Sequence, residues 1–312
     1  MSAAIASERQ RAFELFGSRV RLLVSADGAG TMALVEALLR GLHDALTRFD
    51  PGSELCRLND DPREEVPVST PLALAIDAGA KAFDISGGLV DVTVLPELER
   101  AGYARSRVGL EPADLRAALA AAPARRPASA RSRRRFEVDV EAAIVRRPAG
   151  LRFDLGGVGK GLAADLAGRQ LGQAQSWVAD CGGDVRIGGR APRPREVQVG
   201  DPFGPGNCFS FPLRSGAVAT SGLRTRVWEQ DGRYAHHLID PGTGAPAWTG
   251  VAQATALAPT AVEAEALAKT ALLLGPAEGA ARLRAHGGLL ILDDGGIIAA
   301  GALDDLRQAA AA

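Results

Sequence analysis

The sequence predicts an α+β fold in which largely antiparallel sheets pack against helices. Its 312 residues are 46% apolar, which is enough to bury a substantial core in one large domain or two. Predicted strands and helices are interspersed along the chain, without the strict alternation that a doubly wound parallel sheet requires. Several neighbouring strands are separated only by short turns, which favours antiparallel hairpins.

The N-terminal half is predicted to contain one strand and two long helices. Alternating apolar residues predict the strand over 19–24. Apolar residues at helical spacing predict the helices over 31–46 and 72–83. A polar loop at 47–55 follows the first helix, and residues 87–93 leave the second in an extended or turning conformation.

The rest of the chain is predicted to be rich in short strands, which lie at 135–140, 144–148, 150–154, 177–180, 185–187, 196–199, 209–213, 217–220, 251–258, 289–292 and 297–299. Short turns predict three hairpins, formed by 135–140 with 144–148, 209–213 with 217–220, and 289–292 with 297–299. A capping box at Thr260 and Glu263 opens a late helix. Gly275 and Pro276 stop it before a further helix over 277–286.

The segment 154–161 carries the strongest functional signal, because it combines the carboxylate of Asp154, four glycines and Lys160. A predicted strand precedes it, and apolar residues at helical spacing follow it from Leu162. A glycine turn that leads into a helix N-terminus binds anions through free backbone amides and the helix dipole. Only three of the 36 basic residues are lysines. A lysine at position 160 therefore favours a functional role that requires a compact point charge, which a guanidinium does not provide.

Two common nucleotide-binding motifs do not fit this segment. A P-loop needs glycine six residues before the lysine and Ser or Thr after it, where this chain has Asp154 and Gly161. The dinucleotide fingerprint G-x-G-x-x-G, started at Gly157 and Gly159, would need glycine where Leu162 stands. The turn therefore predicts an anion site of another kind.

Composition limits the partners and the compartment. A net charge of −1 and a pI of about 6.5 argue against a nucleic-acid surface, and the basic stretch 125–135 is interpreted as a solvated loop. No apolar run is long enough to span a membrane, and the first residues lack a signal-peptide core. Three cysteines, Cys56, Cys181 and Cys208, lack metal-ligand spacing and suggest reduced thiols. We expect a cytoplasmic protein.

Other polar clusters leave alternatives open. His237 and Asp240 precede a Pro-Gly-Thr-Gly turn and form either a polar cluster aimed at a ligand or a turn capped by Asp240. Paired glycines between Asp180 and Asp184 suit either a close approach to a ligand or a simple turn. The turn at 220–222 is explained by turn chemistry.

Glu265 and Lys269 lie four residues apart on the capped late helix. They form either an ordinary helical ion pair or a charged pair that something polar must meet. The neighbouring residues are almost all alanine and leucine, so the helix offers the pair no solvated face. Burying such a pair is unfavourable without a polar partner.

Together these segments resemble the FAD:protein FMN transferases, the ApbE family. The matching segments, in order, lie at 49–59, 87–93, 154–161, 182–184, 220–222, 237–244 and 265–275. The resemblance covers about residues 15 to 300, and seven segments in the family's order are far more specific than any one of them. It implies a T-fold-like α+β domain over 15–302, with a flexible N-terminus at 1–14 and a C-terminal tail at 303–312.

The resemblance also implies an activity. The chain would bind FAD and transfer its FMN half through a phosphoester bond to a Thr or Ser hydroxyl of a target flavoprotein, releasing AMP, normally with Mg²⁺. A relative that binds FAD, or hydrolyses it as a pyrophosphatase, without flavinyl transfer is the alternative.

The resemblance assigns residues to that site. Phe49 would cover the flavin ring, and the cofactor would further be contacted by Leu89, Val90, Asp91, Asp154, Lys160 and Ile239. The catalytic residues implied are Lys160, His237 and Asp240, the last two close to the diphosphate.

At the family's metal site, this chain has different residues. It uses the backbone oxygen at the position of Gly157 together with an Asp and a Thr, which here are Glu265 and Lys269. A protonated lysine cannot ligate Mg²⁺. Lys269 would then replace part of the metal's charge and converge with Lys160 on the diphosphate, or the chain would not transfer FMN.

Overall fold

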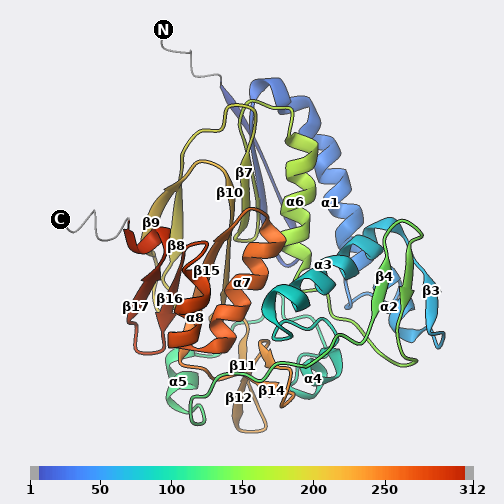
Figure 1. Cartoon of the computed structure of the whole chain (residues 1–312), viewed down its shortest axis with the longest axis vertical. Helices are drawn as coiled ribbons and strands as arrows, with labels where there is room; N and C mark the ends of the chain where they lie inside the picture. The colour runs from blue at the N-terminus through green and yellow to red at the C-terminus, as the bar shows by residue number, and fades with distance from the viewer. Residues whose placement is uncertain (1–6, 306–312) are drawn as a thin grey trace.

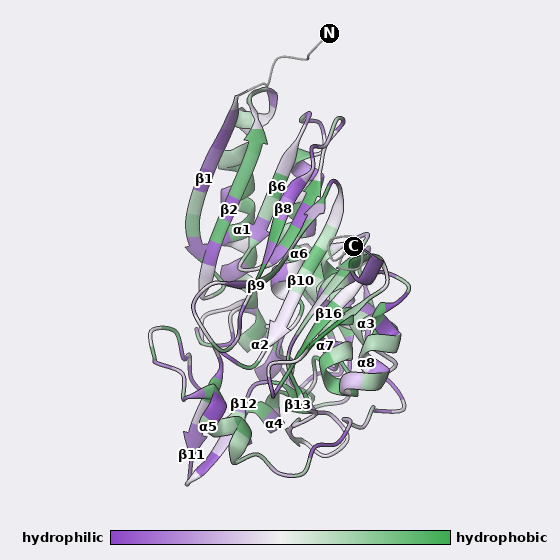
Figure 2. Cartoon of the chain, turned by 90° about the vertical axis from the view of Figure 1, so that its left-hand side faces the viewer, coloured by the Kyte–Doolittle hydropathy of each residue, from purple (hydrophilic) through white to green (hydrophobic). Residues whose placement is uncertain are grey.

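The structure, a computed structural model, describes residues 7–305. At its centre is an eight-stranded sheet in which every neighbouring pair is antiparallel (Figure 1). From edge to edge its strands are β1 (Glu8–Leu15), β2 (Ser18–Ser25), β6 (Trp177–Cys181), β7 (Asp184–Gly188), β10 (Gly216–Gly222), β15 (Val251–Ala258), β16 (Gly288–Leu292) and β17 (Ile297–Ala300). The edge strand β1 carries exposed polar residues, whereas β2 beside it is more hydrophobic (Figure 2). Charged edge strands of this kind discourage pairing with other chains.

Helices cover one face of this sheet (Figure 1). They are α1 (Met32–Leu46), α3 (Thr70–Ser86), α6 (Gly159–Leu171), α7 (Ala261–Leu274) and α8 (Pro276–Leu283). Side-chain alternation along β10 shows how the two faces differ: Ala217 and Ala219 enter the large core with the helices, while Val218 enters a second core. The small side chains on the helix side let α7 pack closely on the strands.

A hairpin of β8 (Arg195–Gly200) and β9 (Asn207–Leu213) covers part of the other face. Val199 and Phe211 of this hairpin share the second core with Val218, Leu289 and Ile291. Smaller elements complete the fold: η1 (Ala26–Thr31), α2 (Glu54–Asp60), β3 (Glu65–Pro67), α4 (Leu95–Arg100), α5 (Leu115–Ala120), β4 (Glu137–Asp139), β5 (Ile144–Arg146), β11 (Val227–Gln230), β12 (Arg233–His236), β13 (Ile239–Asp240) and β14 (Ala245–Pro246).

The predicted class, α+β with largely antiparallel sheets and packed helices, is confirmed. One predicted hairpin is wrong: β9 pairs with β8, and β10 lies between β7 and β15. Burial explains the difference, because β10 is covered on both faces, as a central strand is, whereas β9 alternates between packed and exposed residues.

The strand predicted over 150–154 is also absent, and a side chain takes the place of a neighbouring strand. Asn59 accepts a hydrogen bond from the Phe153 amide at 2.7 Å and donates one to the Phe153 carbonyl at 2.9 Å. Both backbone groups are thereby satisfied in the core without a sheet partner. This amide clamp holds the chain immediately before Asp154.

The ends of the domain also differ from expectation. Residues 8–14, expected to be flexible, belong to β1 and pair with β2, and Leu303, expected to begin a tail, is buried in the second core. The rest of those two predictions, at 1–6 and 306–312, lies outside the described residues. No helix within 7–305 has both the length and the apolar character needed to cross a bilayer.

Candidate functional site

The glycine turn runs from Asp154 to the start of α6 at Gly159 and is fixed at both ends. The Asp154 amide donates to the Val92 carbonyl at 2.8 Å, and Asp154 Oδ1 accepts from the Gly156 amide at 2.9 Å. A Cβ on Gly161 would lie 2.8 Å from both Ala261 O and Glu265 Oε2. Glycine is therefore needed here so that the first turn of α6 can approach α7.

Two lysines and two carboxylates meet at this crossing, and we call Lys160, Asp184, Glu265 and Lys269 the lysine–carboxylate cluster. Lys160 Nζ lies 2.8 Å from Asp184 Oδ2, and Lys269 Nζ lies 2.9 Å from Glu265 Oε1. The carboxylate side chains are each 1% exposed, but the lysine side chains are 19% and 12% exposed. The carboxylates thus form the floor, and the face presented to solvent is positive.

Electrostatics couples the four groups of this cluster. Burial raises the pKa of Glu265 to about 7 against the opposing charge of Lys269. Burial disfavours the charge of Lys160, but the nearby carboxylates of Asp184 and Glu265 outweigh it and raise the pKa of Lys160. Lys160 is therefore charged at neutral pH.

The three positions predicted to hold a metal do come together. A Cβ on Gly157 would lie 3.4 Å from Lys269 Cε, beside the pair with Glu265. Yet Glu265 Oε1 faces Lys269 Nζ, and Oε2 accepts from the Gly161 amide at 3.1 Å. The family's pattern has a side-chain oxygen at both helix positions, whereas Lys269 offers an ammonium. This donor set does not fit a divalent cation.

At the other end of the glycine turn lies an aromatic group of Phe49, Tyr103 and Trp228. Arg48 forms an ion pair with Asp154, and its guanidinium lies 4.2 Å from the Phe49 ring centroid and 4.5 Å from that of Tyr103. Tyr103 stacks obliquely on Trp228 at 5.5 Å, and both are buried. Phe49 is 40% exposed, so it is the member that a ligand can cover.

The positive face and the aromatic group are connected a second time through Arg226. Its guanidinium lies 5.9 Å from the Tyr103 ring centroid, and its charge acts on both Lys160 and His237. The predicted contact residue Ile239 packs in the same apolar cluster as Tyr103 and Trp228. An anionic and an aromatic part of one ligand can therefore be held side by side.

His237 and Asp240 have different surroundings. Asp240 is buried, and its Oδ1 accepts from the amides of Ser129, Gly242 and Thr243 at 2.9, 2.9 and 3.3 Å. It therefore caps the turn. His237 Nδ1 is buried without a hydrogen-bond partner among residues 7–305. Burial, helped by Arg226, His236 and Lys269, holds the pKa of His237 well below its usual value, so the ring is neutral.

The predicted residues of 89–91 lie beside this turn. Leu89 and Val90 are buried among apolar side chains, and Asp91 pairs with Arg131 at 2.8 Å. The Arg131 guanidinium also donates to the Pro241 carbonyl at 3.1 Å. Arg131 thus ties the Asp91 segment to the Asp240 turn.

The stretch 125–135 is a largely exposed loop, as expected, and it also crosses the site. Its Ser129 and Arg131 contact the turn after Asp240, and the Arg131 amide donates to the Gly88 carbonyl at 3.1 Å. A Cβ on Gly88 would lie 2.1 Å from Arg131 O, so only glycine lets the two backbones approach. These contacts could not be predicted from the sequence, because a polar run of arginine and proline residues is typical of an exposed loop.

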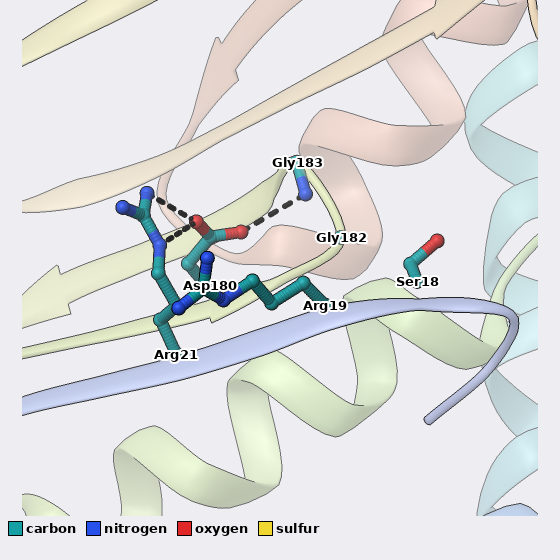
Figure 3. Close-up of a pocket in the computed structure, with 6 residues that line it drawn as sticks. All are labelled: Ser18, Arg19, Arg21, Asp180, Gly182 and Gly183. Carbon is teal, nitrogen blue, oxygen red and sulfur yellow. Dashed lines mark hydrogen bonds and ion pairs between the residues drawn. The ribbon is translucent and has the colours of Figure 1, made fainter. Parts of the chain in front are cut away.

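An open hollow of about 440 Å³ adjoins the Lys160 end of the cluster. Its lining residues are Ser18, Arg19, Arg21, Asp180, Gly182 and Gly183 (Figure 3). Asp180 is held between the Arg21 guanidinium at 2.8 Å and the Gly183 amide at 2.9 Å. The two glycines between Asp180 and Asp184 have positive φ and make the tight turn that brings Asp184 to Lys160.

Comparison with known proteins shows the family of the chain. A model of the ApbE family matches residues 16–292. The chain belongs to the ApbE family. Proteins named FAD:protein FMN transferase are similar to it: that of Treponema pallidum is 35% identical over 177 residues, and that of Haemophilus influenzae is 25% identical over 272 residues. The alignments cover 51% and 81% of this chain, but only 49% of the Treponema protein and 75% of the Haemophilus one.

Solved structures of ApbE proteins have the same fold. The ApbE protein of Thermotoga maritima is 28% identical, with a TM-score of 0.78 over 96% of this chain and 99% of its own. The flavinyl transferase ApbE of Pseudomonas stutzeri is 23% identical, with a TM-score of 0.74 over 96% of each chain, a likeness in fold.

Four residues of the candidate site were not predicted from the sequence. Arg48, Tyr103, Arg131 and Arg226 lie in loops or beside short elements, and none belongs to a spaced motif. For Arg48 one signal existed: it directly precedes Phe49, and a cation next to an exposed aromatic residue often stacks on it. The other three are recognised only through contacts made across the fold.

Proposed function

We propose that this chain is a FAD:protein FMN transferase, which moves the FMN half of FAD to a Thr or Ser hydroxyl of a target flavoprotein. One observation carries the proposal: a single glycine turn joins the exposed Phe49, through Arg48 and Asp154, to the positive face of Lys160 and Lys269. FAD has the matching parts, a flavin ring beside a diphosphate. Names of the relatives support the same activity.

The proposed chemistry is an in-line displacement at phosphorus. The acceptor hydroxyl oxygen attacks the phosphorus on the FMN side, and the P–O bond to the adenylate breaks. AMP leaves with the electron pair of that bond, and its phosphate oxygen takes up the hydroxyl proton, because His237 is held neutral among positive charges and is a poor base. Negative charge grows on the phosphoryl oxygens, and the ammonium groups of Lys160 and Lys269 are positioned to stabilise it.

Asp240, Asp91 and Arg131 would support this reaction indirectly. Asp240 fixes the turn that follows His237, and Arg131 joins that turn to Asp91. Their hydrogen bonds are made within the protein, so their proposed role is to position the site. FAD is the proposed substrate and a flavoprotein the proposed partner.

We also propose a reducing compartment, the cytoplasm. The support is that all three cysteines, Cys56, Cys181 and Cys208, lie in the described part of the chain and are free. Alkylation of intact cells followed by peptide mapping tests this: thiols found as disulfides in the cell would contradict it.

Flavinyl transfer is tested by incubating the protein with FAD and a flavoprotein that the chain is expected to modify, then measuring the intact mass of that flavoprotein. The expected result is a gain of one FMN less one water, with one AMP released per transfer. Free FMN and AMP without a mass gain would indicate a pyrophosphatase. Bound FAD without turnover would indicate a flavin-binding protein.

A pair of lysine variants makes this test specific. Lys160→Met removes the charge beside the glycine turn and should slow transfer by about 10²-fold or more. Lys81→Met removes an exposed lysine paired with Asp77 on α3 and should leave the rate unchanged. Equal rates for the two variants, with both folded, would count against the assigned site.

A further inference from the structure

We propose that Lys269 is the built-in cation of this site, so that the chain binds the diphosphate of FAD without a divalent metal ion. The inference rests on the proposed function, since it takes FAD as the ligand. It starts from the contacts beside Gly157: Glu265 and Lys269 form an ion pair there, and an ammonium is not a metal ligand.

Both carboxylate oxygens of Glu265 already accept hydrogen bonds within the protein. Oε1 pairs with Lys269 Nζ at 2.9 Å, and Oε2 accepts from the Gly161 amide at 3.1 Å. That second bond satisfies an amide in the first turn of α6, which has no partner within the helix. Glu265 is almost fully buried, and a metal bound to it would have to lie next to the Lys269 ammonium, whose positive charge repels a cation.

Four residues separate Lys269 from Glu265 on α7, a spacing that suits a helical ion pair. An ammonium has three N–H donors, and the Glu265 carboxylate engages one of them. Because Lys269 is 12% exposed while Glu265 is 1% exposed, the remaining donors are available to an anionic ligand at the solvent side.

Lys160 supplies a second positive charge near Lys269. Lys160 has its own buried carboxylate, Asp184, so the two lysines do not compete for one partner. Glu265 acts electrostatically on both lysines, and its Oε2 accepts from the amide of Gly161, the residue that follows Lys160. Two cations with a glycine turn between the helices provide the charge that a diphosphate needs.

Lysine usage supports this assignment. The chain has 36 basic residues and only three lysines, of which two lie in the lysine–carboxylate cluster. The third, Lys81, is 63% exposed on α3. Lys269 Cε lies close to Gly157, where an added Cβ would be 3.4 Å away.

The test is the affinity for FAD, measured by flavin fluorescence in EDTA and again in MgCl₂. For the unmodified chain we expect the two dissociation constants to agree within about twofold, well under the tenfold that 1.4 kcal/mol represents. Lys269→Thr should weaken FAD binding in EDTA by about tenfold or more, because a charge-assisted contact is lost. Mg²⁺ should restore part of that affinity, since Thr and Glu265 offer oxygen ligands.

Three controls separate this effect from damage to the fold. Riboflavin has no phosphate, so its affinity should be the same in the Lys269→Thr variant and the unmodified chain. Lys81→Thr removes a lysine outside the site and should not change FAD affinity. The double variant Glu265→Gln with Lys269→Met leaves no unpaired buried carboxylate and should lose FAD affinity in EDTA without rescue by Mg²⁺.

The outcomes distinguish the inference from the proposed function. FAD binding that weakens tenfold or more when EDTA replaces Mg²⁺ in the unmodified chain would overturn the inference and leave the transferase proposal standing. Unchanged FAD affinity in folded Lys269→Thr, or in the double variant, would also overturn it. Failure to bind FAD in either buffer would remove both proposals.

Discussion

The Asp240 carboxylate holds the backbone of the candidate site in place. Its Oδ1 is an acceptor for three backbone amides, and its pair with the Ser129 amide holds the crossing segment in place. An amide oxygen in the same position accepts the same bonds. The charge of Asp240 is therefore less important than its shape.

This predicts different outcomes for two substitutions. Asp240→Asn should retain most stability and transfer activity, because Oδ1 is preserved. Asp240→Ala leaves up to three amides without an acceptor and should lower the free energy of unfolding by roughly 2–3 kcal/mol. Urea titrations and transfer rates of both variants check this. Loss of transfer in a stable Asp240→Asn protein would show that the negative charge takes part in the reaction.

His236 gives the fold a dependence on pH. Burial lowers the pKa of His236 to about 3, and the ring packs edge-on against Trp248 at 4.5 Å. In the unfolded chain the ring takes up a proton near pH 6.5. Since the unfolded state binds more protons between these values, stability present above pH 6.5 is lost as the pH falls toward 3.

We expect the unfolding free energy to fall by roughly 1 kcal/mol more per pH unit between pH 6 and 5 in the unmodified chain than in His236→Asn. His237 is also held neutral by burial, but it is present in both proteins and cancels in the comparison. Denaturant titrations at the two pH values make the measurement. Parallel slopes would mean that His236 is protonated in the folded protein.

At the scale of elements, the site depends on how closely α6 can approach α7. Gly161 sits at the contact, where its amide reaches Glu265 and its Cα faces the Ala261 carbonyl. The lysine–carboxylate cluster exists because these two helix termini meet. Any side chain at Gly161 must push them apart.

Two glycine substitutions test this. Gly161→Ala places a Cβ 2.8 Å from Ala261 O and Glu265 Oε2, and should destabilise the fold by roughly 1–3 kcal/mol and weaken FAD binding. Gly41→Ala, on the exposed side of α1 with nothing within 4 Å, should be stabilising by roughly 0.5–1 kcal/mol. Thermal unfolding compares the pair. Equal shifts for both would contradict the close contact of α6 and α7.

Local pattern was sufficient for elements whose partners are close in sequence. The capping residue Thr260 and the hairpin of β4 and β5 follow rules that operate over a few residues. Pairing of β10 with β7 and β15 does not, because burial of both its faces depends on distant chain segments. Asn59 likewise looks like any helix-end residue until Phe153, 94 positions later, lies against it.

The same limit applies to the site. The glycine turn with Asp154 and Lys160 was recognisable from its residues, whereas the site roles of Gly157, Glu265 and Lys269 followed from the resemblance to the family. The structure brings Gly157 next to the Glu265–Lys269 pair. Arg131 was not recognisable, since its function is defined by contacts with two loops that sequence separates from it. Short motifs predict a candidate anion site, but they do not predict which arginines join the loops around it.

At the scale of the whole molecule, the sheet brings distant segments to one end of the helical layer. The β6–β7 turn supplies Asp184, α6 supplies Lys160, and α7 supplies Glu265 and Lys269. The loop after α1 adds Arg48 and Phe49. A doubly wound parallel sheet binds ligands at the carboxyl ends of its strands. Here the antiparallel order of β2, β6 and β7 instead brings Asp184, at the β6–β7 turn, to Lys160 on α6.

FMN transfer from FAD to a protein hydroxyl can be followed with FAD that carries an isotopic label on the flavin-side phosphate, by mass spectrometry of the products. We expect the labelled phosphate and the flavin to appear together on a Thr or Ser of the target flavoprotein, and the AMP released to be unlabelled. Labelled free FMN as the sole flavin product, with an unmodified flavoprotein, would show that the protein hydrolyses FAD instead.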